Sequence, residues 1–243
     1  MSDVPDPCAL AIENSNPSSG EGGVSVGLRE TSGHIEVLAR ERIAPAKRHD
    51  DALMRTIEQA MTNAARSPKS LDVVVVSCGP GGFTGLRVAI TAAKMIAATT
   101  GCACAPVSSA MVAVRAFQER GHGERIAVAM AGKRGTAWVA WIDTNATVDQ
   151  QLDAAMKGAV VDHAQFVDEV TNRRIDTLIA DAHAPESIRD AAHDAGLQVV
   201  APEFTSDACL SLAWSATPVD PLALAPLYPR EPEAVSKWRE LHG

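Results

Sequence analysis

The stretch Gly79-Pro80-Gly81-Gly82-Phe83-Thr84-Gly85-Leu86-Arg87 decides the fold, because it joins two segments of different pattern. The apolar run before it, residues 71–78, predicts a buried strand, and residues 84–99 predict a helix. A strand that leads through a glycine-rich turn into a helix is typical of anion-binding loops. The stretch lacks, however, the Gly-Lys-Ser/Thr ending of a P-loop and the spacing of a dinucleotide fingerprint. Two interpretations therefore stay open: a phosphate loop, or a tight turn that packs a helix closely on a sheet.

The segments on either side alternate between strand and helix patterns. Before the stretch, residues 8–13, 24–28 and 35–39 predict strands, and residues 50–65 predict a helix. After it the same order returns more loosely, with strands at 126–130, 136–142, 159–161, 175–180 and 197–200, and helices at 163–172, 185–195 and 206–215. Two successive βββαβα units predict a duplicated α/β fold. We expect two subdomains, residues 1–104 with the glycine-rich stretch and residues 105–243 with an irregular C-terminal tail.

Composition restricts the class of protein. The 243 residues are 46% hydrophobic, which is ample for a core, yet no apolar run reaches the length of a membrane span. The first residues, MSDVPDP, are acidic and proline-rich, unlike a signal peptide, so we expect a cytoplasmic protein. The net charge of −8 argues against a main nucleic-acid-binding surface, which needs clustered Lys and Arg.

Cysteine and histidine patterns favour neither redox nor metal chemistry. The five cysteines lie largely in apolar segments, which predicts buried thiols, and Cys102-Ala103-Cys104 has the wrong spacing for a CxxC pair. The seven histidines form no HxxxH pair on a helix. Ser108 and Ser109 are better explained as caps at a helix start than as nucleophiles.

A duplicated βββαβα order with this glycine-rich turn resembles the actin-like ATPase superfamily and, within it, the TsaB family of tRNA threonylcarbamoyladenosine synthesis. The resemblance runs nearly end to end, and the turn is its most specific part. Four weaker matches follow in the expected order: residues 11–15 (AIENS) resemble the family's A-I-D-T-S, His49-Asp50 its His-Ser or His-Thr pair, Val107-Ser108-Ser109 its V-S-T, and residues 226–230 (PLYPR) its P-x-Y-x-R.

The chain also departs from the family pattern. The family often has D-A-R and then E-V-Y in its second-half hairpin, where this chain has Ala131-Gly132-Lys133 and Thr136-Ala137-Trp138, so no role of those acidic residues is carried over. In actin-like ATPases the first hairpin supplies an Asp and a glycine-rich phosphate turn. Here Glu13 replaces the Asp and the turn has no glycine, which leaves weak metal–nucleotide binding open.

The resemblance implies a non-catalytic subunit. The related catalytic protein TsaD carries a metal on a V-N-H-x-x-x-H helix, and an alignment through Val107 places those histidines on Ser109 and Ala113. We therefore expect no metal and no catalytic residue here. The chain would bind TsaD and, with the ATPase TsaE, allow threonylcarbamoyl transfer to adenosine 37 of tRNA. ATP and metal would belong to the partner complex, and tRNA would contact this chain only indirectly.

The expected partner surface combines two helices. The helix after the glycine-rich stretch is rich in alanine, which allows another helix to approach closely. The resemblance implies a helical bundle with TsaD, or a homodimer through the same face. The residues expected there are His49, Leu53, Arg87, Thr91, Lys94 and Ala98. Two rival hypotheses stay open: an actin-like enzyme, either metallopeptidase-like or a small-molecule kinase, and an interaction protein with another partner.

Overall fold

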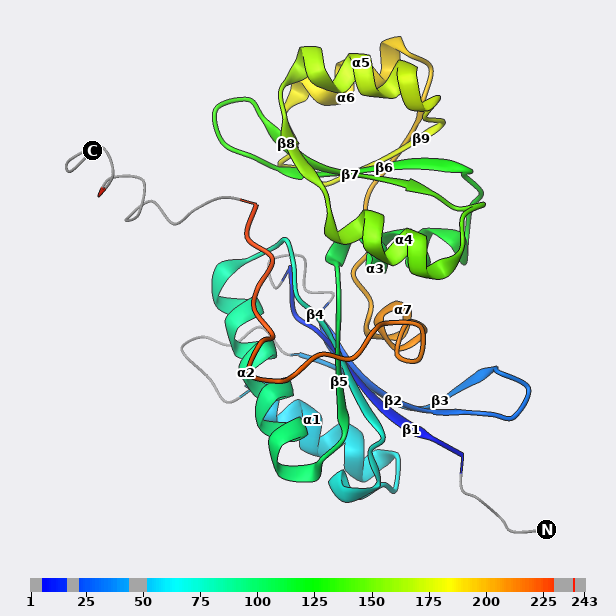
Figure 1. Cartoon of the computed structure of the whole chain (residues 1–243), viewed down its shortest axis with the longest axis vertical. Coiled ribbons are helices and arrows are strands. Elements are labelled where there is room, and N and C mark those ends of the chain that lie inside the picture. Colours follow the sequence, from blue (N-terminus) through cyan, green and yellow to red (C-terminus); the bar gives the residue numbers. More distant parts are fainter. Residues whose placement is uncertain (1–5, 17–21, 44–51, 230–237, 239–243) are drawn as a thin grey trace.

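The computed structural model describes residues 6–16, 22–43, 52–229 and 238, and within them two five-stranded sheets form (Figure 1). The first sheet has the order β3-β2-β1-β4-β5. Its elements are β1 (Cys8–Glu13), β2 (Gly23–Arg29), β3 (Ile35–Arg42), α1 (Ala52–Asn63), the 3-10 turn η2 (Pro68–Ser70), β4 (Val73–Ser77), α2 (Phe83–Thr100) and β5 (Ala103–Val107). All five residues of β4 are buried, as the β-branched run predicts for a central strand covered on both faces.

The second sheet has the order β10-β9-β6-β7-β8. Its strands are β6 (Arg125–Ala131), β7 (Ala137–Asp143), β8 (Ala159–Val161), β9 (Thr177–Ala180) and β10 (Gln198–Val200). The helices of this half are α3 (Ser109–Gln118), α4 (Val148–Met156), α5 (His163–Arg173), α6 (Glu186–Asp194) and α7 (Ser206–Leu210).

The two sheets have equivalent topologies. In each, the first strand pairs antiparallel with the second and parallel with the fourth, so β1, β2 and β4 correspond to β6, β7 and β9. The helix α2 then corresponds to α6, because each follows the fourth strand of its unit. This correspondence confirms the predicted duplicated α/β fold.

The helices separate into three layers around the sheets (Figure 1). The helices α1 and α2 cover the outer face of the first sheet, and α5 and α6 cover the outer face of the second. Between the sheets, α3, α4 and α7 contribute to one shared core that holds residues from both, such as Val75 on β4 and Val128 on β6. The two halves therefore share their largest hydrophobic cluster.

Several expected boundaries differ from those observed. The helix α4 was not predicted; it begins at Thr147, whose hydroxyl accepts a hydrogen bond from the Gln150 N–H in a capping box. The last predicted helix, 206–215, is a helix only over α7. Residue 104 lies inside β5, and the subdomain division at that position stays a prediction. Within the described part of the chain, no helix is long and apolar enough to cross a membrane.

Candidate functional site

The glycine-rich stretch begins at the end of β4 and continues into α2. Gly79 has φ +111°, a conformation that side chains with a Cβ rarely adopt. A Cβ at Gly79 would also lie 2.9 Å from the Leu227 carbonyl oxygen and 2.9 Å from Leu86 Cδ1. The Gly79 carbonyl accepts hydrogen bonds from the Ser109 N–H at 2.8 Å and from the Ser108 hydroxyl at 3.2 Å. The turn is thus fixed to the start of α3, where Ser108 is the predicted cap.

The same stretch packs directly against the turn that follows β1. A Cβ at Gly81 would lie 2.2 Å from the Ser15 carbonyl oxygen, closer than any real contact allows. The Gly82 N–H donates to that oxygen at 2.6 Å, and the Asn14 amide donates to the Gly85 carbonyl at 3.2 Å. These contacts occupy backbone groups that an anion would otherwise meet, which favours the close-packing interpretation of the glycines.

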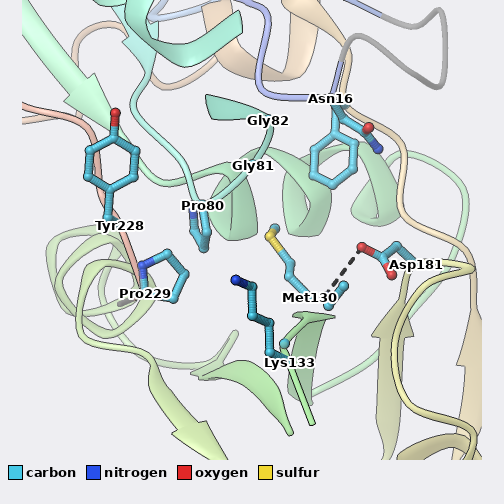
Figure 2. Close-up of a pocket in the computed structure, with 12 residues that line it drawn as sticks. Asn16, Pro80, Gly81, Gly82, Met130, Lys133, Asp181, Tyr228 and Pro229 are labelled. Carbon is cyan, nitrogen blue, oxygen red and sulfur yellow. Dashed lines mark hydrogen bonds between the residues drawn. The ribbon is translucent and has the colours of Figure 1, made fainter. Parts of the chain in front are cut away.

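A cavity of about 380 Å³ lies beside this contact, between the two halves (Figure 2). It is lined by residues that follow the carboxyl ends of parallel strands in both sheets, the place where α/β folds bind ligands. The lining residues are Asn16, Pro80, Gly81, Gly82, Met130, Ala131, Gly132, Lys133, Asp181, Phe204, Tyr228 and Pro229. Figure 2 shows Lys133 pointing into the cavity and a hydrogen bond, drawn as a dashed line, that ends at Asp181. In this bond the Ala131 N–H donates to an Asp181 carboxylate oxygen at 3.5 Å.

The residues around the cavity do not fit a metal-bound nucleotide. The carboxylate of Glu13, which replaces the expected Asp, is 0% exposed, does not line the cavity, and accepts the Ser15 N–H at 2.7 Å. Among the described residues, no group of three or more His, Cys, Asp or Glu side chains could hold a metal ion. Residues 14–16, which directly follow β1, include no glycine for phosphate oxygens.

Buried thiols lie near the carboxylate of Glu13. All five cysteines are free and buried, which confirms the prediction from their apolar surroundings. Burial, opposed by a backbone hydrogen bond and assisted by the negative charge of Glu13, raises the pKa of Cys78 to about 12. Burial also raises the pKa of Cys209 well above its usual value. Neither thiol is a thiolate near neutral pH, so neither is an activated nucleophile.

The expected partner residues divide between surface and core. Arg87, Thr91 and Ala98 are exposed on α2, and Lys94 is half-buried. Leu53, in contrast, is 2% exposed and belongs to the core under the first sheet, so its expected place at the partner surface is wrong. Its apolar spacing on α1 turns it inward, and the exposed neighbour is Met54. His49 lies outside the described residues.

The sequence analysis missed the apolar side chains on the outer face of α2. Met95 is 57% exposed, and Val88 and Phe83 are also exposed. Val88, Thr91, Met95 and Ala98 follow one another at spacings of three and four, and so form a stripe on one side of the helix. The signal was available in the sequence, because α2 is apolar on more faces than one sheet can cover.

The beginning of α2 also contacts the C-terminal segment. The Phe83 ring stacks on the Tyr228 ring at a centroid distance of 5.5 Å, and the Arg87 guanidinium lies 4.2 Å from the Phe83 centroid. The Leu227 N–H donates to the Cys78 carbonyl at 2.7 Å. Residues 226–229 therefore contact both the end of the strand segment at Cys78 and the start of α2.

The chain is similar in sequence to proteins of one family. The family model described as "TsaD: tRNA N6-adenosine threonylcarbamoyltransferase" matches residues 37–214. An uncharacterized protein of Mycobacterium tuberculosis is 31% identical over 237 residues, which cover 96% of this chain and 97% of that protein. The TsaB protein of Bacillus subtilis, named for tRNA threonylcarbamoyladenosine biosynthesis, is 32% identical over 88 residues, 36% of this chain and 35% of that protein.

Solved structures show the same fold. YeaZ from Pseudomonas aeruginosa superposes with a TM-score of 0.62 at 20% identity, and the match covers 91% of this chain and 99% of that chain. A second Pseudomonas aeruginosa structure, described as similar to peptidase YEAZ, gives a TM-score of 0.63 at 18% identity over 92% of this chain and 100% of that chain. Because the family model spans most of the chain and the duplicated fold is that of YeaZ, this chain belongs to the TsaD family as a TsaB-like member with the actin-like ATPase fold.

Proposed function

We propose that this chain is a non-catalytic, TsaB-type subunit in tRNA threonylcarbamoyladenosine biosynthesis. It binds a TsaD-family protein, and that partner, with a TsaE-type ATPase, transfers the threonylcarbamoyl group to adenosine 37 of tRNA. The similarity to TsaB and YeaZ supports the general role. The observation that carries the partner hypothesis is the apolar stripe on α2, because exposed apolar patches mark interaction sites.

The two positions that align with the metal-binding histidines of TsaD support a non-catalytic role. Ser109 is fully buried at the start of α3, and its hydroxyl lies 2.9 Å from the Ser77 hydroxyl. Ala113, one turn later, packs in the shared core between the sheets. Neither side chain offers an imidazole, and the space around both is filled by protein. Catalysis is therefore assigned to the partner.

The remaining expectations belong to this proposal. The protein acts in the cytoplasm, contacts tRNA only through its partner, and takes ATP and metal only as parts of the complex. A homodimer through α2 would use the surface that the TsaD-family partner needs. The two assemblies would therefore exclude each other.

Co-purification with the TsaD-family protein of the same genome tests the proposal. We expect a stable complex from co-expressed proteins, and we expect threonylcarbamoyladenosine formation in a reconstituted mixture to require this chain. Met95→Glu should remove the complex, because it places a charge in the apolar stripe. Val160→Glu is the matched control, since Val160 is an exposed apolar residue on β8 of the other sheet.

The rival enzyme hypothesis predicts a different result. A small-molecule kinase would bind ATP without a partner, in the cavity beside Gly81, and would transfer phosphate without it. Tight ATP binding by the isolated chain, together with no complex at micromolar concentration, would contradict the proposed function.

A further inference from the structure

The short helix α7 lies on three small residues of β2, Gly23, Ser25 and Gly27, which we call the seat. A Cβ at Gly23 would lie 3.1 Å from the Ser206 hydroxyl oxygen. A Cβ at Gly27 would lie 2.8 Å from Leu210 Cδ2. Ser25 lies between the two glycines and points the same way, because side chains alternate along a strand. The seat therefore lets α7 approach the first sheet closely, but it offers few side-chain contacts.

A polar network joins α7 to the seat. The Ser25 hydroxyl lies 2.7 Å from the Ser206 hydroxyl and donates to an Asp207 carboxylate oxygen at 2.6 Å. The Arg40 guanidinium on β3 donates to that carboxylate from Nε at 2.9 Å and forms an ion pair with it. Ser25 and Ser206 are buried, whereas the Arg40 side chain is 63% exposed. Water therefore reaches the outer end of the network and competes for its bonds.

The chain reaches α7 from the second half through residues 201–205, which have no regular secondary structure. Glu203 forms an ion pair with Arg120, which follows α3. Phe204 is buried and lines the cavity between the two halves. A second cavity, of about 350 Å³, is lined by Glu203 and by the beginning of α7. This segment thus forms part of the walls of two cavities, so a movement of it changes both.

Several features of α7 favour local opening. Its five residues are too few for a helix that is stable alone. It lies between the irregular residues 201–205 and the turns of residues 211–215, and it belongs to neither sheet. Segments outside the hydrogen-bond ladders of a sheet open more readily than its central strands. Cys209 and Leu210 are 0% exposed and hold α7 in place, so the open form is the minor population.

We propose that the network of Ser25, Arg40, Ser206 and Asp207 is a latch, and that its release lets α7 leave the seat while both sheets stay folded. The buried serines give the latch its direction, and the exposed arginine is the point at which it opens. This inference does not depend on the proposed function, because no partner takes part in it.

Labelling of the native protein with N-ethylmaleimide, followed by mass spectrometry of each cysteine, tests the latch. Cys209 reports on α7, and Cys104, which is buried on β5 under α2, is the control within the same molecule. Burial raises the pKa of both thiols, so each reacts only when an opening exposes it. Below the urea concentrations that unfold the protein, we expect Cys209 to react at least about fivefold faster than Cys104. Its rate should depend little on urea, because local opening exposes little surface.

Two variants weaken the latch at different points. Ser25→Ala removes the hydroxyl that contacts both Ser206 and Asp207, and Arg40→Gln removes the ion pair at the exposed end. We expect each to speed the labelling of Cys209 at least about fivefold and to leave that of Cys104 within about twofold of the wild type. Arg42→Gln is the matched control, since it changes an exposed arginine of β3 outside the network and should react like the wild type.

Two results would overturn the inference. In the first, Cys209 and Cys104 of the wild type react at equal rates with the same dependence on urea, which would mean that α7 opens only when the whole protein unfolds. In the second, Ser25→Ala and Arg40→Gln leave the labelling of Cys209 within about twofold of the wild type, so that the network does not hold α7. Arg40→Gln changes an exposed side chain and decides the matter even if Ser25→Ala does not fold.

Discussion

The helices α2 and α6 occupy equivalent places in the two halves, yet their outer faces differ. The exposed residues of α6 are all polar or charged: Glu186, Ser187, Asp190, His193 and Asp194. The outer face of α2 instead carries Phe83, Val88 and Met95, and no acidic side chain. Both helices bury one face on a sheet, so the fold does not require the difference. One copy of the duplicated unit thus keeps a solvated polar surface, while the other exposes apolar side chains.

The turns before α2 and α6 also differ, in the kind of contact that holds each turn in place. In the first half, backbone contacts backbone, with Gly82 bonded to the Ser15 carbonyl. In the second half a side chain makes the connection, because the Asp181 carboxylate accepts the His183 N–H at 2.8 Å and the Ala131 N–H at 3.5 Å. A backbone contact requires residues without a Cβ, whereas a side-chain contact does not.

The largest expected effect tests the two turns. Gly81→Val places a Cβ 2.2 Å from the Ser15 carbonyl oxygen, so we expect the free energy of unfolding to fall by about 3 kcal/mol. Ala182→Val, in the exposed turn after β9, should change it by less than about 0.5 kcal/mol. Urea unfolding measures both. Equal effects of the two variants would show that the turns are not packed differently.

Alkaline pH should lower the stability of the first half more than that of the second half. Burial raises the pKa of Cys78 from its ordinary value of 9.0 to about 12 in the folded protein, so the folded state keeps a proton that the unfolded state loses. Stability is therefore complete below pH 9 and falls as pH rises toward 12, by about 1.4 kcal/mol per pH unit for one such thiol. Unfolding between pH 8 and 11 measures the slope.

Cys78→Ala separates the contribution of this thiol. Because the variant has no proton to lose at that position, its stability should fall less steeply above pH 9 than that of the wild type. Parallel curves for the two proteins would contradict the raised pKa. Hydrogen exchange should show β4 losing protection before β9, since Cys78 directly follows β4, whereas no cysteine lies in or next to β9.

The difference between α2 and α6 predicts a loss of association without a loss of stability. Ala98 is exposed near the end of α2, so Ala98→Glu should leave melting unchanged and weaken TsaD-family binding by about 2 kcal/mol. Ser187→Glu, on the exposed face of α6, should leave both unchanged. Calorimetry and thermal melting check the pair. A loss of affinity in the α6 variant would place the partner on the other half.

The smallest expected effect concerns the C-terminal segment, residues 218–229. Among the residues that the structure describes, the buried Tyr228 hydroxyl has no hydrogen-bond partner, while its ring stacks on Phe83. Tyr228→Phe keeps the ring and removes the unpaired hydroxyl, so stability should stay the same or rise by up to about 1 kcal/mol. Tyr228→Ala removes the stacking and should destabilise the protein. A clear loss of stability in the Phe variant would mean that the hydroxyl makes a bond that the contacts do not show.

Local pattern predicted every strand except β5, and most helices, because each of these elements contains its own periodicity. The run of buried valines in β4 and the glycine-rich turn are of this kind. The helix α4 was missed because its sequence, VDQQLDAAM, has a weak apolar stripe, although the Thr147–Gln150 capping box was a usable signal. Leu53 was wrongly expected at the partner surface for the opposite reason. It belongs to the clear apolar stripe of α1, and such a stripe marks the buried face of a helix.

The candidate site depends on contacts between distant residues, which local pattern does not show. Nothing near Gly81 in the sequence indicates that Ser15 will touch it, and nothing near Leu222 indicates Lys94. The resemblance to TsaB pointed to α2 as the partner surface, but not to the residues of that helix that face outward. To identify the residues of α2 that face outward, the burial of each side chain in the folded protein must be known, because the exposed residues are those that the core does not take up.

The C-terminal segment, residues 218–229, also determines when the protein can finish folding during its synthesis. The edge of β5 is made early, but the Val219 N–H that bonds to Cys104 belongs to a segment translated more than a hundred residues later. Until that segment leaves the ribosome, the nascent chain presents an open sheet edge, which other chains can extend. A message truncated before residue 218 would thus yield a protein in which the edge of β5 is uncovered. Proteins of this kind are substrates for chaperones and proteases.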